Sequence, residues 1–150
     1  MKKMNNKGFS LVELIIVIAI MAILLVVLAP QYLRYVERSR NSTDLQNATE
    51  IVTALQIYAS DPEATVVPAD GTITIDATTH NLANTTFEGA ALADAGLLNG
   101  TTLETRCQSR TAWTTYTIEW DIVNGNLQFD YSSNSTDTPD PFATRMAGGN

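Results

Sequence analysis

The feature that most constrains this chain is an uninterrupted apolar run near its N-terminus, Leu14–Pro30, which has no charged or hydrophilic side chain. Extended back to Phe9, the segment Phe9–Ala29 has 21 residues, which is enough for a helix to cross a bilayer. A secretory signal has a shorter apolar stretch followed by a small-residue cleavage site, and no A-x-A-like site follows this run. The sequence therefore predicts one membrane-spanning helix.

Charge is distributed unevenly around this span. Lys2, Lys3 and Lys7 precede it, which predicts a cytoplasmic N-terminus with the bulk of the chain outside. From Asp61 onward twelve acidic residues face only three arginines, and the whole chain has a formal net charge of −7. Nucleic-acid binding needs clustered Lys or Arg, so the acidic external domain disfavours a nucleic-acid partner.

A single carboxylate, Glu13, lies close to the start of the apolar segment. At the centre of a bilayer such a charge costs roughly 2.5–3.5 kcal/mol, and the cost is lower near the end of the span. One interpretation is a side chain that reaches back into the headgroup region. The other is a carboxylate with a specific partner, and the residues around Glu13 favour this second interpretation.

The segment KGFSLVELIIVIAIMAIL resembles the N-terminus of the type IV pilin superfamily, which includes type IV pilins, type II secretion pseudopilins and competence pilins. The matching features are a Lys-rich leader ending in Gly8, the aromatic Phe9, Glu13 four residues later, and the aliphatic run to Pro30. The resemblance implies that residues 1–8 are a leader peptide, which a prepilin peptidase removes by cutting between Gly8 and Phe9. It also implies that Phe9 is then N-methylated.

The same resemblance implies roles in filament assembly for Phe9, Glu13 and Pro30. Cleavage creates an ammonium group on Phe9, and Glu13 would pair with this group on a neighbouring subunit. Removing one partner of a buried ion pair costs ~3–5 kcal/mol, so such a pair can set the register between subunits. Pro30 removes a helical hydrogen bond, which predicts a kink at the membrane exit or the local unwinding that filaments of this family show there.

The remaining sequence predicts an α+β fold, in which one long N-terminal helix packs against a small antiparallel sheet as in type IV pilins. Residues 9–30 are expected to form the transmembrane and filament-core half of the helix, and residues 31–60 its amphipathic half, which ends at Asp61-Pro62. The amphipathic half is predicted from apolar residues at intervals of three and four, namely Leu45, Ala48, Val52, Leu55 and Ala59.

Residues 61–150 are expected to form a globular head. It comprises a connecting loop over 61–100, an antiparallel sheet at about 101–132 and a polar C-terminal coil over 133–150. Within the connecting loop, Thr72–Asp76 is predicted to be a short strand and Gly89–Leu98 a short helix.

A β-hairpin is the clearest prediction in the head. Apolar residues alternate with polar ones over residues 113–131, and Asn124-Gly125 is a strong two-residue turn. This turn predicts three cross-strand pairs on one face: Ile122 with Leu127, Trp120 with Phe129 and Ile118 with Tyr131. A third strand is expected from Thr102–Arg106 or its neighbourhood.

The outer face of this hairpin raises the question of a metal. Glu119 is expected opposite Asp130, with Asp121 close by, and like charges directly opposed are unfavourable. A calcium ion could relieve the repulsion, as in the heads of major type II secretion pseudopilins, and the tail residues Asp137 and Asp140 are further candidates. No EF-hand loop is present, and carboxylates on a wet face are usually solvated, so the sequence favours a head without a metal or other cofactor.

Two single residues complete the set of reactive side chains. Cys107 cannot form an intrachain disulfide and is expected to be a small buried residue. His80 has no evident partner in the sequence and is expected in a solvated loop. With one Cys, one His, no G-x-S-x-G motif and no cluster of metal ligands, the sequence indicates no enzyme.

The function expected from these observations is that of a structural subunit of a type IV pilus. Its expected partners are further copies of itself, the prepilin peptidase, the assembly platform with its ATPase, and the cytoplasmic membrane. It would span that membrane once before assembly and lie in a cell-surface filament afterwards. The alternatives are a type II secretion pseudopilin or a competence pilin for DNA uptake. A membrane-anchored binding module that does not polymerise would leave Gly8, Phe9 and Glu13 unexplained.

Overall fold

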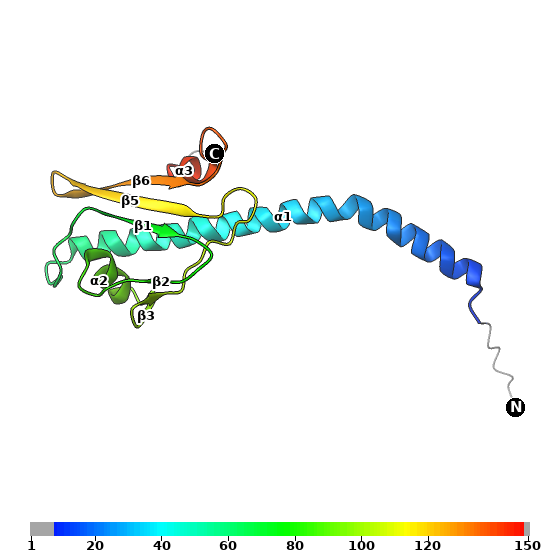
Figure 1. Ribbon diagram of the computed structural model, residues 1–150, viewed down its shortest axis with the longest axis horizontal. Coiled ribbons are helices and arrows are strands. Elements are labelled where there is room, and N and C mark those ends of the chain that lie inside the picture. The colour runs from blue at the N-terminus through cyan, green and yellow to red at the C-terminus, as the bar shows by residue number, and fades with distance from the viewer. Residues whose placement is uncertain (1–7, 149–150) are drawn as a thin grey trace, which may run out of the picture. The chain divides into compact units, whose positions relative to one another are not determined.

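The structure is a computed structural model that describes residues 8–148. The described chain divides after Val36 into two compact units. Helix α1, Leu11–Ser60, has 50 residues, so its first part belongs to the N-terminal unit and its remainder to the second unit (Figure 1). The second unit adds small antiparallel sheets and two short helices, which gives the predicted α+β fold.

The described part of the N-terminal unit is the apolar half of α1 preceded by Gly8–Ser10, which has no regular secondary structure. Among the described residues, α1 is long and apolar enough to cross a membrane, and its most apolar stretch has no buried residue. Pro30 lies inside α1, which continues through it. Of the expected leader, residues 1–7 lie outside the described residues.

In the second unit, α1 supplies one wall of the hydrophobic core. Its buried apolar residues are Ala48, Ile51, Val52, Ala54, Leu55 and Tyr58. The predicted stripe is therefore confirmed, with Leu45 and Ala59 partly buried at its margins. The helix ends at Ser60, directly before Asp61-Pro62, as predicted.

The main sheet has three antiparallel strands in the order β1-β5-β6, with β1 at Gly71–Ile75, β5 at Tyr116–Val123 and β6 at Asn126–Ser133. Strands β5 and β6 form the predicted hairpin (Figure 1), and the three predicted cross-strand pairs are all confirmed. At the turn, Asn124 and Gly125 have φ angles of 55° and 80°. A type I′ turn requires positive φ at both central positions, which explains this pair of residues.

The prediction that Thr102–Arg106 provides the third strand of this sheet is wrong. The third strand is β1, whose Ile73 lies opposite Ile118 of β5. The expected strand exists only as β4, Thr102–Leu103, in a second small sheet with the order β2-β4-β3, where β2 is His80–Asn81 and β3 is Leu98–Asn99. Alternation of apolar and polar residues predicted the strand β1 itself. Its pairing with β5 joins residues more than 40 positions apart and leaves no local signal in the sequence.

Two short helices close the core, and both differ from the predictions. Helix α2, Phe87–Asp94, begins and ends earlier than expected. Its start is set by Thr86, whose side chain accepts a hydrogen bond from Gly89 N and caps the first turn. The C-terminal tail is not simply a polar coil, since residues Pro141–Met146 form helix α3, which packs on β6. Phe142 of α3 is fully buried and stacks on Tyr116, with ring centroids 4.6 Å apart.

Candidate functional site

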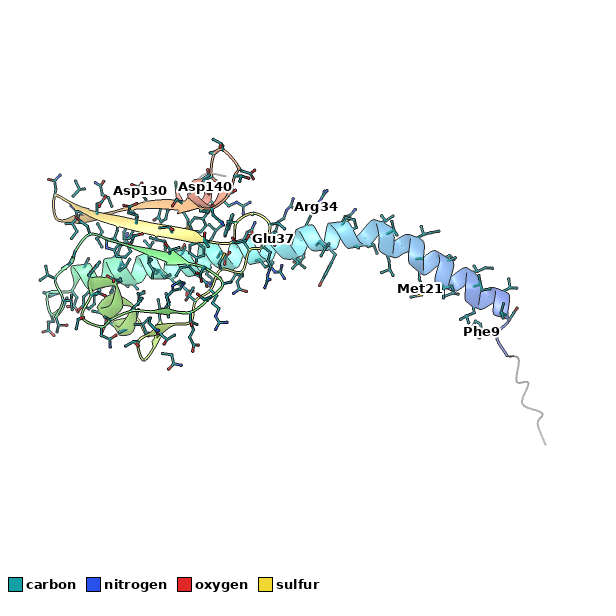
Figure 2. All side chains as sticks on the ribbon, viewed as in Figure 1. Phe9, Met21, Arg34, Glu37, Asp130 and Asp140 are labelled. Carbon is teal, nitrogen blue, oxygen red and sulfur yellow. The ribbon has the colours of Figure 1, made fainter. Side chains whose placement is uncertain are left out.

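The N-terminal segment contains the residues that the sequence assigned to processing. Gly8 and Phe9 precede α1, and the Phe9 side chain is 84% exposed. Figure 2 labels Phe9 and Met21 in this part of the chain. Gly8 and Phe9, on either side of the predicted cleavage point, are therefore both exposed.

Glu13 closes the first turn of α1. Its Oε2 accepts a hydrogen bond from Ser10 N at 2.9 Å, and Leu14 N donates to Ser10 O at 3.2 Å. This is the backbone half of a capping box, in which the residue three positions after the cap satisfies the cap's N–H. The sequence signal for it is the S-x-x-E spacing of Ser10 and Glu13, which was not used in predicting a role for Glu13. The exposed side chain leaves Oε1 open to a second donor.

The apolar half of α1 presents a continuous hydrophobic surface. Every large apolar side chain from Leu11 to Leu28 is between 46% and 75% exposed. Soluble monomers rarely expose contiguous apolar patches beyond a few hundred Å². This surface therefore needs lipid, or other protein helices, as its surroundings.

In the second unit, two carboxylates at the start of the head hold one loop onto α1. Glu37 is labelled in Figure 2, and Asp44 lies two turns further along the same helix. We call the two carboxylates together with loop 107–113 the carboxylate clip. The Oε1 atom of Glu37 accepts four hydrogen bonds at 2.8–3.3 Å, from Ser109 Oγ, Arg110 N, Thr111 N and Ala112 N.

Asp44 forms the buried part of the clip. It is 0% exposed, and its carboxylate accepts hydrogen bonds from Gln108 N at 2.7 Å, Ser109 N at 2.9 Å and Trp113 Nε1 at 3.0 Å. The Cys107 thiol donates a weaker bond to it at 3.4 Å. Two backbone N–H groups of the loop and the Trp113 indole N–H thus satisfy the oxygens of the buried Asp44 side chain.

The clip perturbs the titration of Glu37. Partial burial favours the protonated form, but the hydrogen bonds from Thr111 N, Arg110 N, the Ser109 hydroxyl and Ala112 N outweigh it and lower the pKa from 4.5 to about 2. Arg40 lies 3.7 Å from the second oxygen. Sequence reasoning missed the clip, because its hydrogen bonds join residues 63 to 75 positions apart.

Cys107 is buried, as predicted. Burial is the main cause that raises the pKa of its thiol to about 12, and the neighbouring Asp44 carboxylate adds to it. A thiol with this pKa is a poor nucleophile near neutral pH, so the structure gives it a packing role.

The calcium candidates are not brought together. Glu119 does lie opposite Asp130 in the sheet register, while Asp121 faces Gln128. Within residues 8–148, no three His, Cys, Asp or Glu side chains are grouped closely enough to hold a metal ion. Asp137 lies in the loop that precedes helix α3.

Asp140 has a structural use instead. Its carboxylate accepts hydrogen bonds from Ser133 N and Ser133 Oγ and also caps α3 through Phe142 N and Ala143 N. Partial burial opposes ionisation, but these hydrogen bonds lower the pKa of Asp140 below its usual value.

His80 also differs from expectation. It lies in β2, and its Nε2 is 3.4 Å from the Asp76 carboxylate. The predicted absence of a partner for His80 is therefore wrong. The pair is local, because the two residues lie four positions apart.

Comparison with known proteins gives the following relationships. Residues 3–29 match the family model of the prokaryotic N-terminal methylation motif. The chain is 32% identical over 136 residues to fimbrial protein EcpC of Eikenella corrodens, which covers 90% of this chain and 88% of that protein. It is also 39% identical over 59 residues to the type IV major fimbrial protein FimA of Dichelobacter nodosus, which covers 39% of this chain and 38% of that protein. No solved structure matches it.

Proposed function

The chain belongs to the type IV pilin family, and on that premise we propose that it is the structural subunit of a type IV pilus filament. The subunit is made as a membrane-held precursor, cut between Gly8 and Phe9, N-methylated on Phe9 and polymerised through the apolar half of α1. The observation that carries this proposal is the methylation motif at residues 3–29, which includes the helical stretch Leu11–Leu28 whose large apolar side chains are exposed.

The order of processing and assembly follows from where the cut falls. Because the leader lies before the apolar segment, cleavage leaves the subunit anchored in the cytoplasmic membrane as a reservoir. The lysines on the N-terminal side orient it with the cut on the cytoplasmic side, where a prepilin peptidase acts. An assembly platform and its ATPase then extract the subunit into a cell-surface filament.

Glu13 is proposed to register each subunit against the next. Cleavage creates an α-ammonium group on Phe9, which needs a counter-charge among packed apolar helices. Four helical residues advance about 6 Å, so the carboxylate can meet the amine of a neighbour displaced by one turn. Its Oε2 already accepts from Ser10 N, and its other oxygen remains for the neighbour's amine.

Substitutions at Glu13 test this role separately from helix capping. A glutamine side chain can still accept a hydrogen bond from Ser10 N but carries no charge. An alanine side chain provides neither the acceptor nor the charge. We expect both Glu13→Gln and Glu13→Ala to be cleaved and retained in the membrane, while sheared surface filaments are lost. Mass spectrometry of the wild-type filament should show loss of residues 1–8 and one added methyl group.

The outcomes distinguish the parts of the proposal. Normal filaments from Glu13→Gln would contradict the charge pair and leave Glu13 with only its capping role. An uncleaved chain in a host with a prepilin peptidase would contradict the processing scheme. Failure to find any wild-type surface filament containing this chain would favour a pseudopilin or a competence pilin instead.

A further inference from the structure

Arginine side chains gather at the end of the head where α1 enters it. The second unit begins at Glu37, and Arg38 and Arg40 follow directly on α1. The clip brings Arg110 of loop 107–113 to the same place, because Glu37 Oε1 accepts a hydrogen bond from Arg110 N at 2.8 Å. The other oxygen of Glu37 lies 3.7 Å from Arg40 Nη1. We call Arg38, Arg40 and Arg110 the arginine cluster.

The cluster keeps most of its positive charge. Arg38 and Arg110 are exposed, and among residues 8–148 no carboxylate lies within ion-pair distance of either guanidinium. Arg40 pairs with Glu37, but this carboxylate also accepts four hydrogen bonds from the loop. Asp44, the next acid along α1, is fully buried. The clip therefore holds both neighbouring acids of α1 against the loop and leaves two arginine side chains unpaired.

The rest of the head is acidic. From Asp61 onward it has twelve acidic residues against three arginines, of which Arg110 belongs to the cluster. Asp137 is an exposed acid beside the loop, where it lines a hollow of about 220 Å³ together with Thr111. A surface of negative charge repels a domain of this composition. Such a surface therefore meets the head most favourably at the end that carries the arginine cluster.

The sequence before the cluster sets its distance from the apolar segment. The apolar run ends at Pro30, and Tyr32 and Tyr35 follow it with side chains 67% and 73% exposed. Tyrosine is enriched at the level of the lipid headgroups, where its ring and its hydroxyl suit both surroundings. Arg38 follows Tyr35 by three residues, which is about 4.5 Å along a helix. A long arginine side chain at this position can reach the headgroups.

We propose that the arginine cluster binds the phosphate groups of anionic phospholipids in the membrane that holds the subunit. The inference rests on the proposed function, in which the subunit waits in a membrane before assembly. The planar guanidinium of arginine matches the geometry of phosphate oxygens. Attraction to anionic lipids falls off within a Debye length of about 8–10 Å. The contact therefore orients the head on the lipid surface and ends when the subunit leaves the membrane.

Lipid titration of charge variants tests this assignment. The full-length chain in detergent micelles is titrated with anionic phosphatidylglycerol or with phosphatidylcholine, which has no net charge, and native mass spectrometry counts the bound lipids. We expect wild type to prefer phosphatidylglycerol, and this preference to shrink at high salt. Arg110→Gln should weaken phosphatidylglycerol binding by roughly fivefold, and the double variant Arg38→Gln/Arg110→Gln by roughly 30-fold.

Gln56→Glu is the matched control. It changes the net charge by the same amount as Arg110→Gln, but Gln56 is exposed on α1 18 residues after Arg38, about 27 Å along the helix. This variant should bind phosphatidylglycerol as wild type does. Equal losses from Gln56→Glu and Arg110→Gln would overturn the proposal, because net charge alone would then set the lipid preference. A wild-type chain with no preference for phosphatidylglycerol would overturn it too.

Photo-crosslinking locates the contact. A photo-crosslinking amino acid replaces Thr111, the exposed neighbour of Arg110, in full-length chains held in phosphatidylcholine nanodiscs that also contain phosphatidylglycerol. We expect adducts that carry the added mass of phosphatidylglycerol. Links only to another copy of the chain, whose acidic head is the alternative anionic surface, would overturn the lipid assignment. Cleavage after Gly8 and recovery of wild-type chain in sheared filaments are measured separately, so the proposed function can stand when the lipid contact fails.

Discussion

Replacement of Asp44 by alanine should destabilise the head more than any change at an exposed carboxylate of α1. The side chain is 0% exposed and accepts hydrogen bonds from Gln108 N, Ser109 N and Trp113 Nε1. Alanine removes the acceptor but leaves the donors in place. Loop 107–113 then loses the buried part of the carboxylate clip.

The magnitude follows from the donors left behind. Ser109 N and Trp113 Nε1 are buried, and a buried donor without a partner costs about 1–3 kcal/mol. Two such donors give about 2–6 kcal/mol, from which the better helix propensity of alanine subtracts up to about 0.7 kcal/mol. The expected loss is a large fraction of the about 5–15 kcal/mol that stabilises a typical domain.

The assay is urea unfolding of the full-length chain in detergent micelles, followed by tryptophan fluorescence and extrapolated linearly to water. Trp113 and Trp120 are both at most 2% exposed, so their emission should report unfolding of the head. Asp44→Asn keeps one acceptor oxygen and should fall between wild type and Asp44→Ala. Glu50→Ala is the control, because an exposed carboxylate on the same helix should change stability by less than about 0.5 kcal/mol.

A loss below about 1 kcal/mol for Asp44→Ala would refute the reasoning, since even one orphaned buried donor should cost that much. The same conclusion would follow if Asp44→Ala and the Glu50→Ala control were equally stable. In either case the clip would be a contact that the rest of the head can replace.

Two further predictions concern ionisation around the clip. Because the folded-state pKa of Glu37 is lowered from 4.5 to about 2, its contribution to stability is present above pH 4.5 and is lost as the pH falls towards 2. The stability difference between wild type and Glu37→Gln should therefore shrink over this range in urea unfolding curves recorded at several pH values, and a constant difference would contradict the assignment. The Cys107 thiol, whose pKa is raised to about 12, should resist alkylation by iodoacetamide at pH 8 in the folded wild-type chain. It should react faster in Asp44→Ala. Rapid alkylation of the folded wild type would disprove the burial of Cys107.

The prediction of the N-terminal part of the candidate site rests on local signals. Within 23 consecutive residues lie a charge-free apolar run, the Gly8-Phe9 pair and Glu13. Both lipid and a partner helix require an apolar surface on this segment, whatever the position of the head. The hairpin was equally accessible, since Asn124-Gly125 sets its register through backbone conformation alone. The capping role of Glu13 was present in the S-x-x-E spacing as well.

Only the tertiary structure decided what the polar residues of the head do. Asp140 reads in sequence as one of several tail acids, yet it caps α3 and holds Ser133. Glu37 and Asp44 read as ordinary charges on a helix, yet they bind backbone N–H groups of a loop more than 60 residues away. The prediction of the third strand was wrong for a similar reason, because strand pairing also joins residues that lie far apart in the sequence.

The difference between the features that the sequence predicted and those that only the fold showed has one physical cause. Hydrophobic burial and turn geometry depend on the order of neighbouring residues, so the sequence alone determined the membrane segment, the amphipathic stripe of α1 and the hairpin. A buried carboxylate or an edge strand is stabilised by whichever donors the folded chain brings to it. Most of the donors to Asp44 and Glu37 are backbone N–H groups, which every sequence has, so only the fold could decide which of them these carboxylates would bind.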